Sequence, residues 1–340
     1  MAGRIATLDA MRGLAVLFML EVHLGSWWAQ SLPADNVLVS AGTLLGGMAA
    51  PLFLVLAGVG LSLSRKREPG HFVRRSAIRG AAILVIGLLF TFIEQAVYGP
   101  WGWGVLQCIG LSIVLCAPLM TIPRQGRAFL GIGLMALAAF LRPLLGVPAV
   151  LYSDQLLAVG SVNDYLRNML VSGFFPLLPW LGFMVLGTAI GDRVAASEGG
   201  TVRLSLPDLS LPMTMILAGA LLTAYGVAPV FFPPSLSFCL LACGIVLLAI
   251  PLFLSADLGR LRPLSDLGRL SLTLFIAHHL VGYELFYVAG LLHSFDLPAA
   301  LAMVLASWAL ALAAARFWVR WDLCWSLERA LYRLGRPASK

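Results

Sequence analysis

The sequence predicts an all-α membrane protein, a helical bundle of about ten transmembrane spans with both termini in the cytoplasm. Hydrophobic residues make up 60% of the chain and charged residues only 11%, whereas a soluble domain carries about 25% charged residues. Apolar runs of bilayer-crossing length recur from one end to the other. Lys and Arg gather in alternate connections, as they do in cytoplasmic loops. These three observations exclude a soluble enzyme.

Ten apolar segments are the expected spans. They lie at 10–28, 41–63, 77–95, 104–122, 128–146, 173–191, 211–228, 235–254, 270–290 and 298–316. Of the 23 Lys and Arg residues, only Arg142 and Arg167 fall on the outer side of this arrangement. The net charge of +7 therefore reports topology in a cytoplasmic (inner) membrane, and no nucleic-acid partner is expected.

Residues 1–316 are expected to form a single transmembrane domain, with a cytoplasmic tail at 317–340. The tail alternates Arg with Trp and Leu at helical spacing, which predicts an amphipathic helix on the lipids of the inner leaflet. The Gly-, Ser- and Pro-rich loop 192–210 predicts a cytoplasmic connection between six earlier and four later spans. The five cysteines lack zinc or disulfide spacing and are interpreted as packing residues.

The first span carries the strongest candidate site. His23 follows Arg12 by eleven positions, which returns it to nearly the same helix face. The rise along the helix places it about 16 Å deeper, near the middle of the bilayer. Asp9 shares this face. A histidine at that depth is a candidate general base, although a histidine that only packs in the bundle is the alternative.

Further polar residues lie toward the outer side. His278 and His279 are adjacent in the ninth span, so one is expected to face the site while the other packs. Two adjacent histidines do not make a metal site by themselves, and no metal is expected. Tyr283, Glu284 and Glu94 are candidates to support a polar acceptor, with solvated helix ends as the alternative. Glu21 turns about 180° from Arg12 and is expected to face another helix or the outer interface.

The loop at 65–79 holds six positive charges and has two interpretations. It marks the cytoplasmic side and attracts anionic lipid. Alternatively, it binds the phosphates of a nucleotide-bearing donor. The candidate donor residues in this loop are Arg65, Arg67, Arg74 and Arg75.

Four segments resemble a known family. RIATLDAMRGLAVLFMLEVH at the start, with ten residues between Arg12 and His23, resembles the arginine–histidine first span of membrane sugar acyltransferases. APLFLVLAGVGLSLSRKR resembles their second span and basic loop. FFPLLPWLGFMVLGTAIG and LGRLSLTLFIAHHL resemble spans of the heparan-alpha-glucosaminide N-acetyltransferase family. The chain is therefore similar to the transmembrane acyltransferase superfamily that joins these groups.

The resemblance implies transfer of an acyl group, most simply acetyl, from cytoplasmic acyl-CoA to an acceptor at the outer face. It assigns the base or acyl relay to His23 and the donor side to Arg12, with Asp9 beside it. Lysosomal-type members have asparagine at the His23 position and a histidine in the next loop, whereas residues 29–40 hold no histidine. The acceptor, a sugar or another small molecule, therefore stays open.

Two functions follow from the sequence. The first is an acyl-CoA-dependent acyltransferase in which the acceptor attacks the thioester directly, since no second nucleophile is apparent. The second is a proton-coupled exporter that relays protons through His23, Glu21 and His278. A homodimer is compatible with either function.

Overall fold

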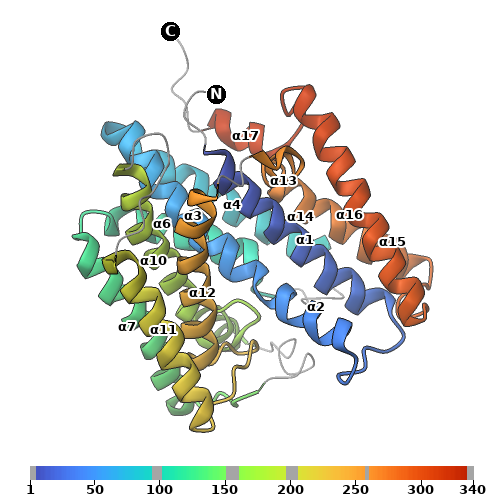
Figure 1. Cartoon of the computed structure of the whole chain (residues 1–340), viewed down its shortest axis with the longest axis horizontal. Coiled ribbons are helices and arrows are strands. Elements are labelled where there is room, and N and C mark those ends of the chain that lie inside the picture. Colours follow the sequence, from blue (N-terminus) through green and yellow to red (C-terminus); the bar gives the residue numbers. More distant parts are fainter. Residues whose placement is uncertain (1–4, 94–101, 151–160, 197–205, 257–259, 335–340) are drawn as a thin grey trace. The chain divides into compact units, whose positions relative to one another are not determined.

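The computed structural model describes residues 5–93, 102–150, 161–196, 206–256 and 260–334. This part of the chain is all-α, as predicted, and each of the ten expected spans overlaps at least one helix (Figure 1). Six helical stretches are long and apolar enough to cross a membrane: Val37–Arg67, Pro69–Ile93, Arg124–Leu144, Val162–Ala196, Leu236–Ser255 and Leu297–Arg320. Val105–Leu119 and Leu209–Ala224 are shorter apolar helices. The protein is polytopic, and the count of ten crossings with both termini inside stays a prediction.

The chain forms two compact units, of which the first holds the candidate site. This unit comprises Met1–Phe53 and Ala256–Arg333. Its helices are α1 (Ala6–Trp28), α2 (Val37–Gly47), the start of α3 (Ala49–Arg67), α13 (Arg262–Gly268), α14 (Ser271–His279), the π-helix η5 (Leu280–Glu284), α15 (Leu285–Val288), α16 (Leu297–Arg320) and α17 (Leu327–Leu334). The earliest and latest parts of the sequence therefore fold together.

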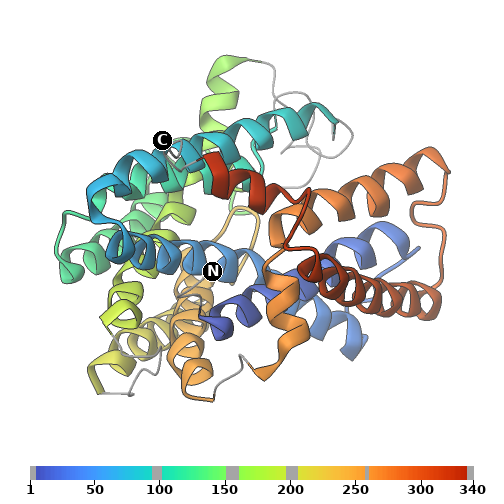
Figure 2. The same ribbon diagram turned by 90° about the horizontal axis from the view of Figure 1, so that it is seen from above.

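Helix α1 is the centre of the first unit. Leu8, Met11, Ala15 and Met19 recur at helical spacing and are all nearly inaccessible to solvent, which gives α1 an apolar face for packing. It contacts α2, α13, α14 and α16, as the view from above in Figure 2 helps to follow. Asp266 of α13 accepts a hydrogen bond from Arg316 of α16 at 3.0 Å, so two of these neighbours are also joined to each other.

The tail helix α17 caps the helix that carries His278 and His279. Oε1 of Glu328 accepts hydrogen bonds from the backbone N–H groups of Leu272 at 2.7 Å and Thr273 at 3.0 Å. Oε2 accepts from the Thr273 hydroxyl at 2.6 Å. The first N–H groups of a helix have no partner within it, so a carboxylate there both satisfies them and complements the helix dipole. The tail therefore fixes the start of α14.

The second unit comprises Leu54–Ser255 and Leu334–Lys340. Besides the rest of α3, its helices are η1 (Pro69–His71), α4 (Phe72–Ile93), α6 (Val105–Leu119), α7 (Arg124–Leu144), α9 (Val162–Arg167), the π-helix η2 (Asn168–Ser172), α10 (Leu177–Ala196), α11 (Leu206–Ala224) and α12 (Leu236–Ser255). Helix α4 packs on α6, α7 on α10, and α11 on α12.

Aromatic rings fill part of the core of this second unit. Trp180 is fully buried and lies 4.9 Å from Phe183 and 5.6 Å from both Phe175 and Phe231, measured between ring centroids. Buried aromatic pairs of this kind add about 0.5–1.5 kcal/mol beyond their area burial. The Pro-Trp segment noted in the sequence therefore has a packing role here.

Candidate functional site

The candidate site is a cluster of three histidines in the first unit. His23 lies in the second half of α1, and His278 and His279 are the last two residues of α14, directly before the π-helix η5. His278 and His279 are 7% and 1% exposed, and His23 is partly buried. π-Helical turns inside α-helices occur frequently at functional sites. The structure thus brings together the two histidine motifs that the sequence placed at opposite ends of the chain.

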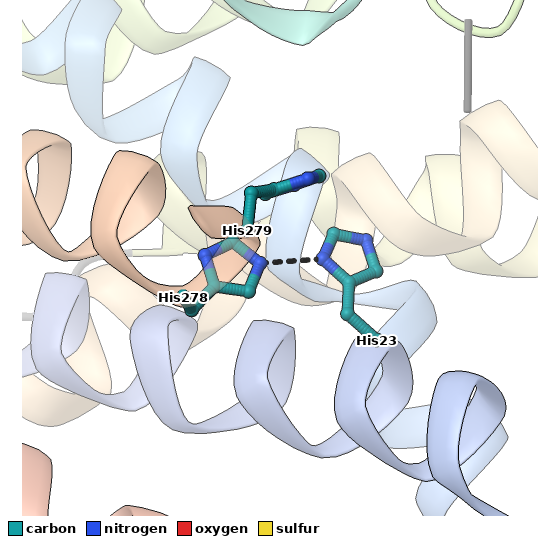
Figure 3. A group of neighbouring side chains, drawn as sticks. All are labelled: His23, His278 and His279. Carbon is teal, nitrogen blue, oxygen red and sulfur yellow. Dashed lines mark hydrogen bonds between the residues drawn. The ribbon is translucent and has the colours of Figure 1, made fainter. Parts of the chain in front are cut away.

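His23 and His278 form a hydrogen bond. Nδ1 of His23 lies 2.9 Å from Nε2 of His278 (Figure 3). Their rings are stacked with centroids 5.2 Å apart and an interplanar angle of 7°. The ring of His279 meets that of His23 edge-on at 5.4 Å. Both members of the His278–His279 pair therefore face His23, whereas the sequence predicted that only one of them would.

A backbone carbonyl sets the tautomers of this pair. Nδ1 of His278 lies 3.2 Å from the carbonyl oxygen of Leu274, which can only accept, so this nitrogen carries a proton. In the neutral ring Nε2 of His278 then holds the lone pair, and Nδ1 of His23 donates to it. The lone pair of neutral His23 is consequently on Nε2. An oriented imidazole with its lone pair on Nε2 is the arrangement of a general base.

Aromatic side chains hold the three rings in place. The Trp27 ring stacks on His23 with centroids 5.2 Å apart and meets His279 edge-on at 4.9 Å. Tyr283, a predicted support residue, meets Trp27 at 5.2 Å. The Phe275 ring lies 5.0 Å from His279. The cluster is therefore a ring-lined site in which rotation of the imidazoles is restricted.

Close packing fixes the π-helix against α1. The indole N–H of Trp28 donates to the carbonyl oxygen of Gly282 at 2.8 Å. A Cβ atom at position 282 would lie 2.3 Å from Cδ2 of Leu24, so a larger residue there would displace the Leu24 side chain. Leu24 and Trp28 follow His23 along α1. The contacts that shape η5 therefore also set the distance between the histidines.

Arg12 forms an ion pair with Asp9. Its Nη1 lies 2.8 Å from Oδ1 of the aspartate, whose side chain is 4% exposed against 24% for the arginine. Helix α13 passes close by, since a Cβ atom on Gly268 would lie 2.9 Å from Cβ of Arg12. Arg12 can therefore have a structural role as the partner of Asp9 instead of a role in binding the acyl-CoA donor. Donor binding by Arg12 and Asp9 stays a prediction.

Residues 65–79, predicted as a basic loop, form the end of α3, the short helix η1 and the start of α4 in the second unit, and several of them have internal partners. Arg65 donates to the carbonyl oxygen of Met120, which caps α6, and Lys66 donates to that of Ala195 at the end of α10. Arg75 pairs with Glu68. Cations at helix C-termini satisfy carbonyls and complement the helix dipole, so these residues also have a structural use. All four candidate donor residues remain untested in that role.

Three of those four residues, Arg65, Arg67 and Arg74, are exposed. Arg65 is exposed as a residue although its guanidinium reaches a carbonyl, and Arg75 is partly buried. A phosphate group approaching this loop would therefore meet Arg67 and Arg74 most readily.

Glu21 and Glu284 form no hydrogen bond with the three histidines in the described part of the chain. Glu21 turns toward α2, where a Cβ atom on Gly42 would lie 2.1 Å from Oε1 of the glutamate; this confirms that it faces another helix. Glu284 ends η5, and its Oε1 is buried with no hydrogen-bond partner in the described part of the chain. Glu94 lies outside the described residues. The acceptor roles of Tyr283, Glu284 and Glu94 stay predictions.

Two contributors were missed in the sequence. Trp27 lies one helical turn beyond His23, and that spacing alone could have pointed to it. Glu328 lies in the tail, which the sequence suggested to be an anchor, and no local signal connects it with α14. Four of the five cysteines are buried, free thiols as expected, namely Cys108, Cys116, Cys239 and Cys243, whereas Cys324 is free but only partly buried.

Residues 4–228 match the family model described as heparan-alpha-glucosaminide N-acetyltransferase, catalytic. This match covers more than half of the 340 residues. The chain belongs to this family. A second model, described as a protein of unknown function (DUF418), matches residues 208–322. A comparison with curated proteins finds no match.

Membership of the heparan-alpha-glucosaminide N-acetyltransferase catalytic family confirms the predicted resemblance. It indicates a multi-pass membrane acetyltransferase with acetyl-CoA as the donor. His23 lies in the first matched segment, and His278 and His279 lie in the second. The histidine cluster therefore combines residues from both segments.

Proposed function

We propose that the protein transfers an acyl group, most simply acetyl, from cytoplasmic acyl-CoA to a hydroxyl or amine of an acceptor at the outer face of the membrane. The acceptor is a sugar or another envelope or secreted metabolite. The observation that carries this proposal is the hydrogen-bonded chain from Leu274 through His278 to His23. That chain leaves a lone pair on Nε2 of His23, in a ring that its neighbours orient.

In the reaction, Nε2 of His23 takes the proton from the acceptor as its oxygen or nitrogen attacks the thioester carbonyl. The new acyl bond forms and the C–S bond breaks, and the departing CoA sulfur receives the proton from the His23 imidazolium. While His23 is charged, its Nδ1–H continues to donate to Nε2 of His278, which stabilises the cation. Direct attack of this kind needs only one base and no acyl-enzyme.

The donor is expected to approach from the cytoplasmic side. Arg12 precedes His23 by about 16 Å of helix rise, which is of the order of a pantetheine arm. The nucleotide can then stay at the interface, with its phosphates near cationic groups, while the thioester reaches the histidines. The acyl group alone crosses the bilayer.

Sealed vesicles of known orientation test the proposal. With acceptors trapped in the lumen of inside-out vesicles, external labelled acetyl-CoA is expected to support transfer, and in right-side-out vesicles it is not. At saturating acetyl-CoA, His23→Ala should lower the rate about 10²–10⁴-fold. The matched variant of an exposed histidine, His71→Ala, should leave that saturated rate unchanged, because any loss of donor affinity in segment 65–79 is then overcome. Equal transfer in both orientations contradicts the cross-membrane route, and wild-type turnover in His23→Ala contradicts the assignment of the base.

The proton-coupled exporter is the second candidate, and one observation disfavours it. A relay through His23, Glu21 and His278 needs the carboxylate near the rings, but Glu21 lies against α2. No hydrogen bond joins Glu21 to any of the three histidines among the residues described. Proton-driven accumulation of a substrate without release of CoA, measured in the same vesicles, would favour the exporter.

A further inference from the structure

The three histidines offer a set of metal ligands. One ring nitrogen from each of His23, His278 and His279 lies within 4.8 Å of the other two. Three imidazoles with an open fourth position are the ligand set of one class of catalytic zinc site. The pair in α14 alone would not form such a site, and His23 completes it from a helix more than 250 residues away in sequence.

The surroundings of His278 match those of a metal ligand. A histidine that binds a metal through one nitrogen almost always donates its other N–H to a carbonyl or carboxylate. Nδ1 of His278 donates to the carbonyl of Leu274 at 3.2 Å, which leaves Nε2 as the ligand atom, directed at His23. Trp27 and Phe275 pack on the rings and restrict their orientation. The ligand nitrogen of His278 is therefore oriented before an ion arrives.

The movement needed to hold an ion is small. A tetrahedral zinc ion with Zn–N distances of about 2.0–2.1 Å keeps its nitrogens about 3.3 Å apart. The His23–His278 pair, now 2.9 Å apart, would open by about 0.4 Å. The ring nitrogen of the third imidazole lies within 4.8 Å of the other two and would approach them by at most about 1.5 Å.

We propose that His23, His278 and His279 bind a divalent transition-metal ion of the zinc class. Imidazole nitrogen is a ligand that zinc, copper and nickel ions accept, whereas magnesium and calcium ions prefer oxygen. For Nδ1 of His23 to bind the ion, its proton must move to Nε2 of the same ring. Solvent carries the proton, and the charge of the imidazole does not change. The ion and the proposed base therefore exclude each other, and the ion inhibits acyl transfer. Ion binding itself does not depend on the proposed function; only the inhibition does.

Cobalt(II), a spectroscopic substitute for zinc, tests the site. Full-length protein in detergent is stripped with a chelator and titrated with cobalt. Wild type is expected to bind one ion per chain, to show the intense visible bands of four- or five-coordinate cobalt, and to lose them when zinc is added. His279→Asn removes a proposed ligand and should weaken binding by more than the roughly tenfold that loss of an outer-shell partner costs, and His71→Asn should bind like wild type. Only the weak spectrum of hydrated cobalt, or equal affinity in His279→Asn, would overturn the proposal.

A second measurement tests the metal site even if His279→Asn does not fold. X-ray absorption of zinc-loaded wild type counts the imidazole ligands directly: three are expected, and fewer than three overturns the proposal. Zinc should also suppress transfer, and a chelator should restore it. If the protein has no transferase activity, the proposed function is wrong, and cobalt binding still tests the metal site. If the protein transfers acyl groups but binds no ion, only the proposed metal site is wrong.

Discussion

Removal of the Glu328 carboxylate should loosen the helix that carries two of the three histidines. In Glu328→Ala, the N–H groups of Leu272 and Thr273 and the Thr273 hydroxyl all lose their acceptor. Loss of a helix N-cap costs about 0.5–2 kcal/mol, and a hydrogen bond to a charged group makes a net contribution of about 1.5–3 kcal/mol. Since Glu328 is only partly buried, we expect a loss of about 2 kcal/mol in unfolding free energy.

The effect on activity follows from the position of the cap. His278 and His279 lie in the turns directly after Thr273, so a shift of α14 moves their rings relative to His23. Misplacement by about 1 Å can lower a rate about 10²-fold, and a smaller shift should give about tenfold. We therefore expect kcat to fall while KM for acetyl-CoA stays the same, because the proposed donor residues are elsewhere.

Thermal unfolding in detergent and initial rates of CoA release measure these two effects. Asp322→Asn is the matched control, because this carboxylate lies in the same tail, is 74% exposed and pairs only with Arg329 in the described chain. Exposed ion pairs contribute about 0–1 kcal/mol, so the control should behave like wild type. If Glu328→Ala matches the control in both measurements, the tail does not position α14.

Two further variants test the donor side and the packing of the π-helix. Arg12→Ala should weaken CoA binding about tenfold, the size of one lost hydrogen bond to a charged group; isothermal titration decides this, and unchanged affinity would leave Arg12 as the structural partner of Asp9. Gly282→Ala should lower stability by about 1–3 kcal/mol through overpacking, because its Cβ would lie 2.3 Å from Cδ2 of Leu24. Leu24→Ala should relieve that effect in the double variant, and strict additivity in thermal unfolding would contradict the contact.

Much of the fold could be predicted from the sequence because hydropathy and loop charge are local signals. The expected first span at 10–28 lies within α1, and the span at 298–316 lies within α16. The expected span at 270–290 is less regular, since it contains α14, η5 and α15 in succession. A π-helical turn depends on tertiary contacts, here those of Gly282 with α1, and hydrophobic periodicity does not report it.

The candidate site could be predicted only in parts. Each histidine motif was recognisable because a titratable residue in an apolar run is unusual. Their meeting was not predictable, because a contact between α1 and α14 joins segments about 255 residues apart, and helical spacing has no information at that range. The cap that Glu328 forms on α14 could not be predicted for the same reason. The exposure of Arg67 and Arg74, in contrast, agrees with the prediction of a basic surface segment.

The contact between α1 and α14 also limits how this protein can change over evolutionary time. The two matched segments overlap only at residues 208–228, and each holds part of the histidine cluster. A gene fusion or exchange that replaced the later segment would remove His278, the hydrogen-bond partner of His23. The contact would survive only if the new segment had a histidine at the end of the helix that replaced α14. The two segments are therefore expected to be inherited together, and a shortened descendant with only the first would keep the helix of His23 but lose the rest of the cluster.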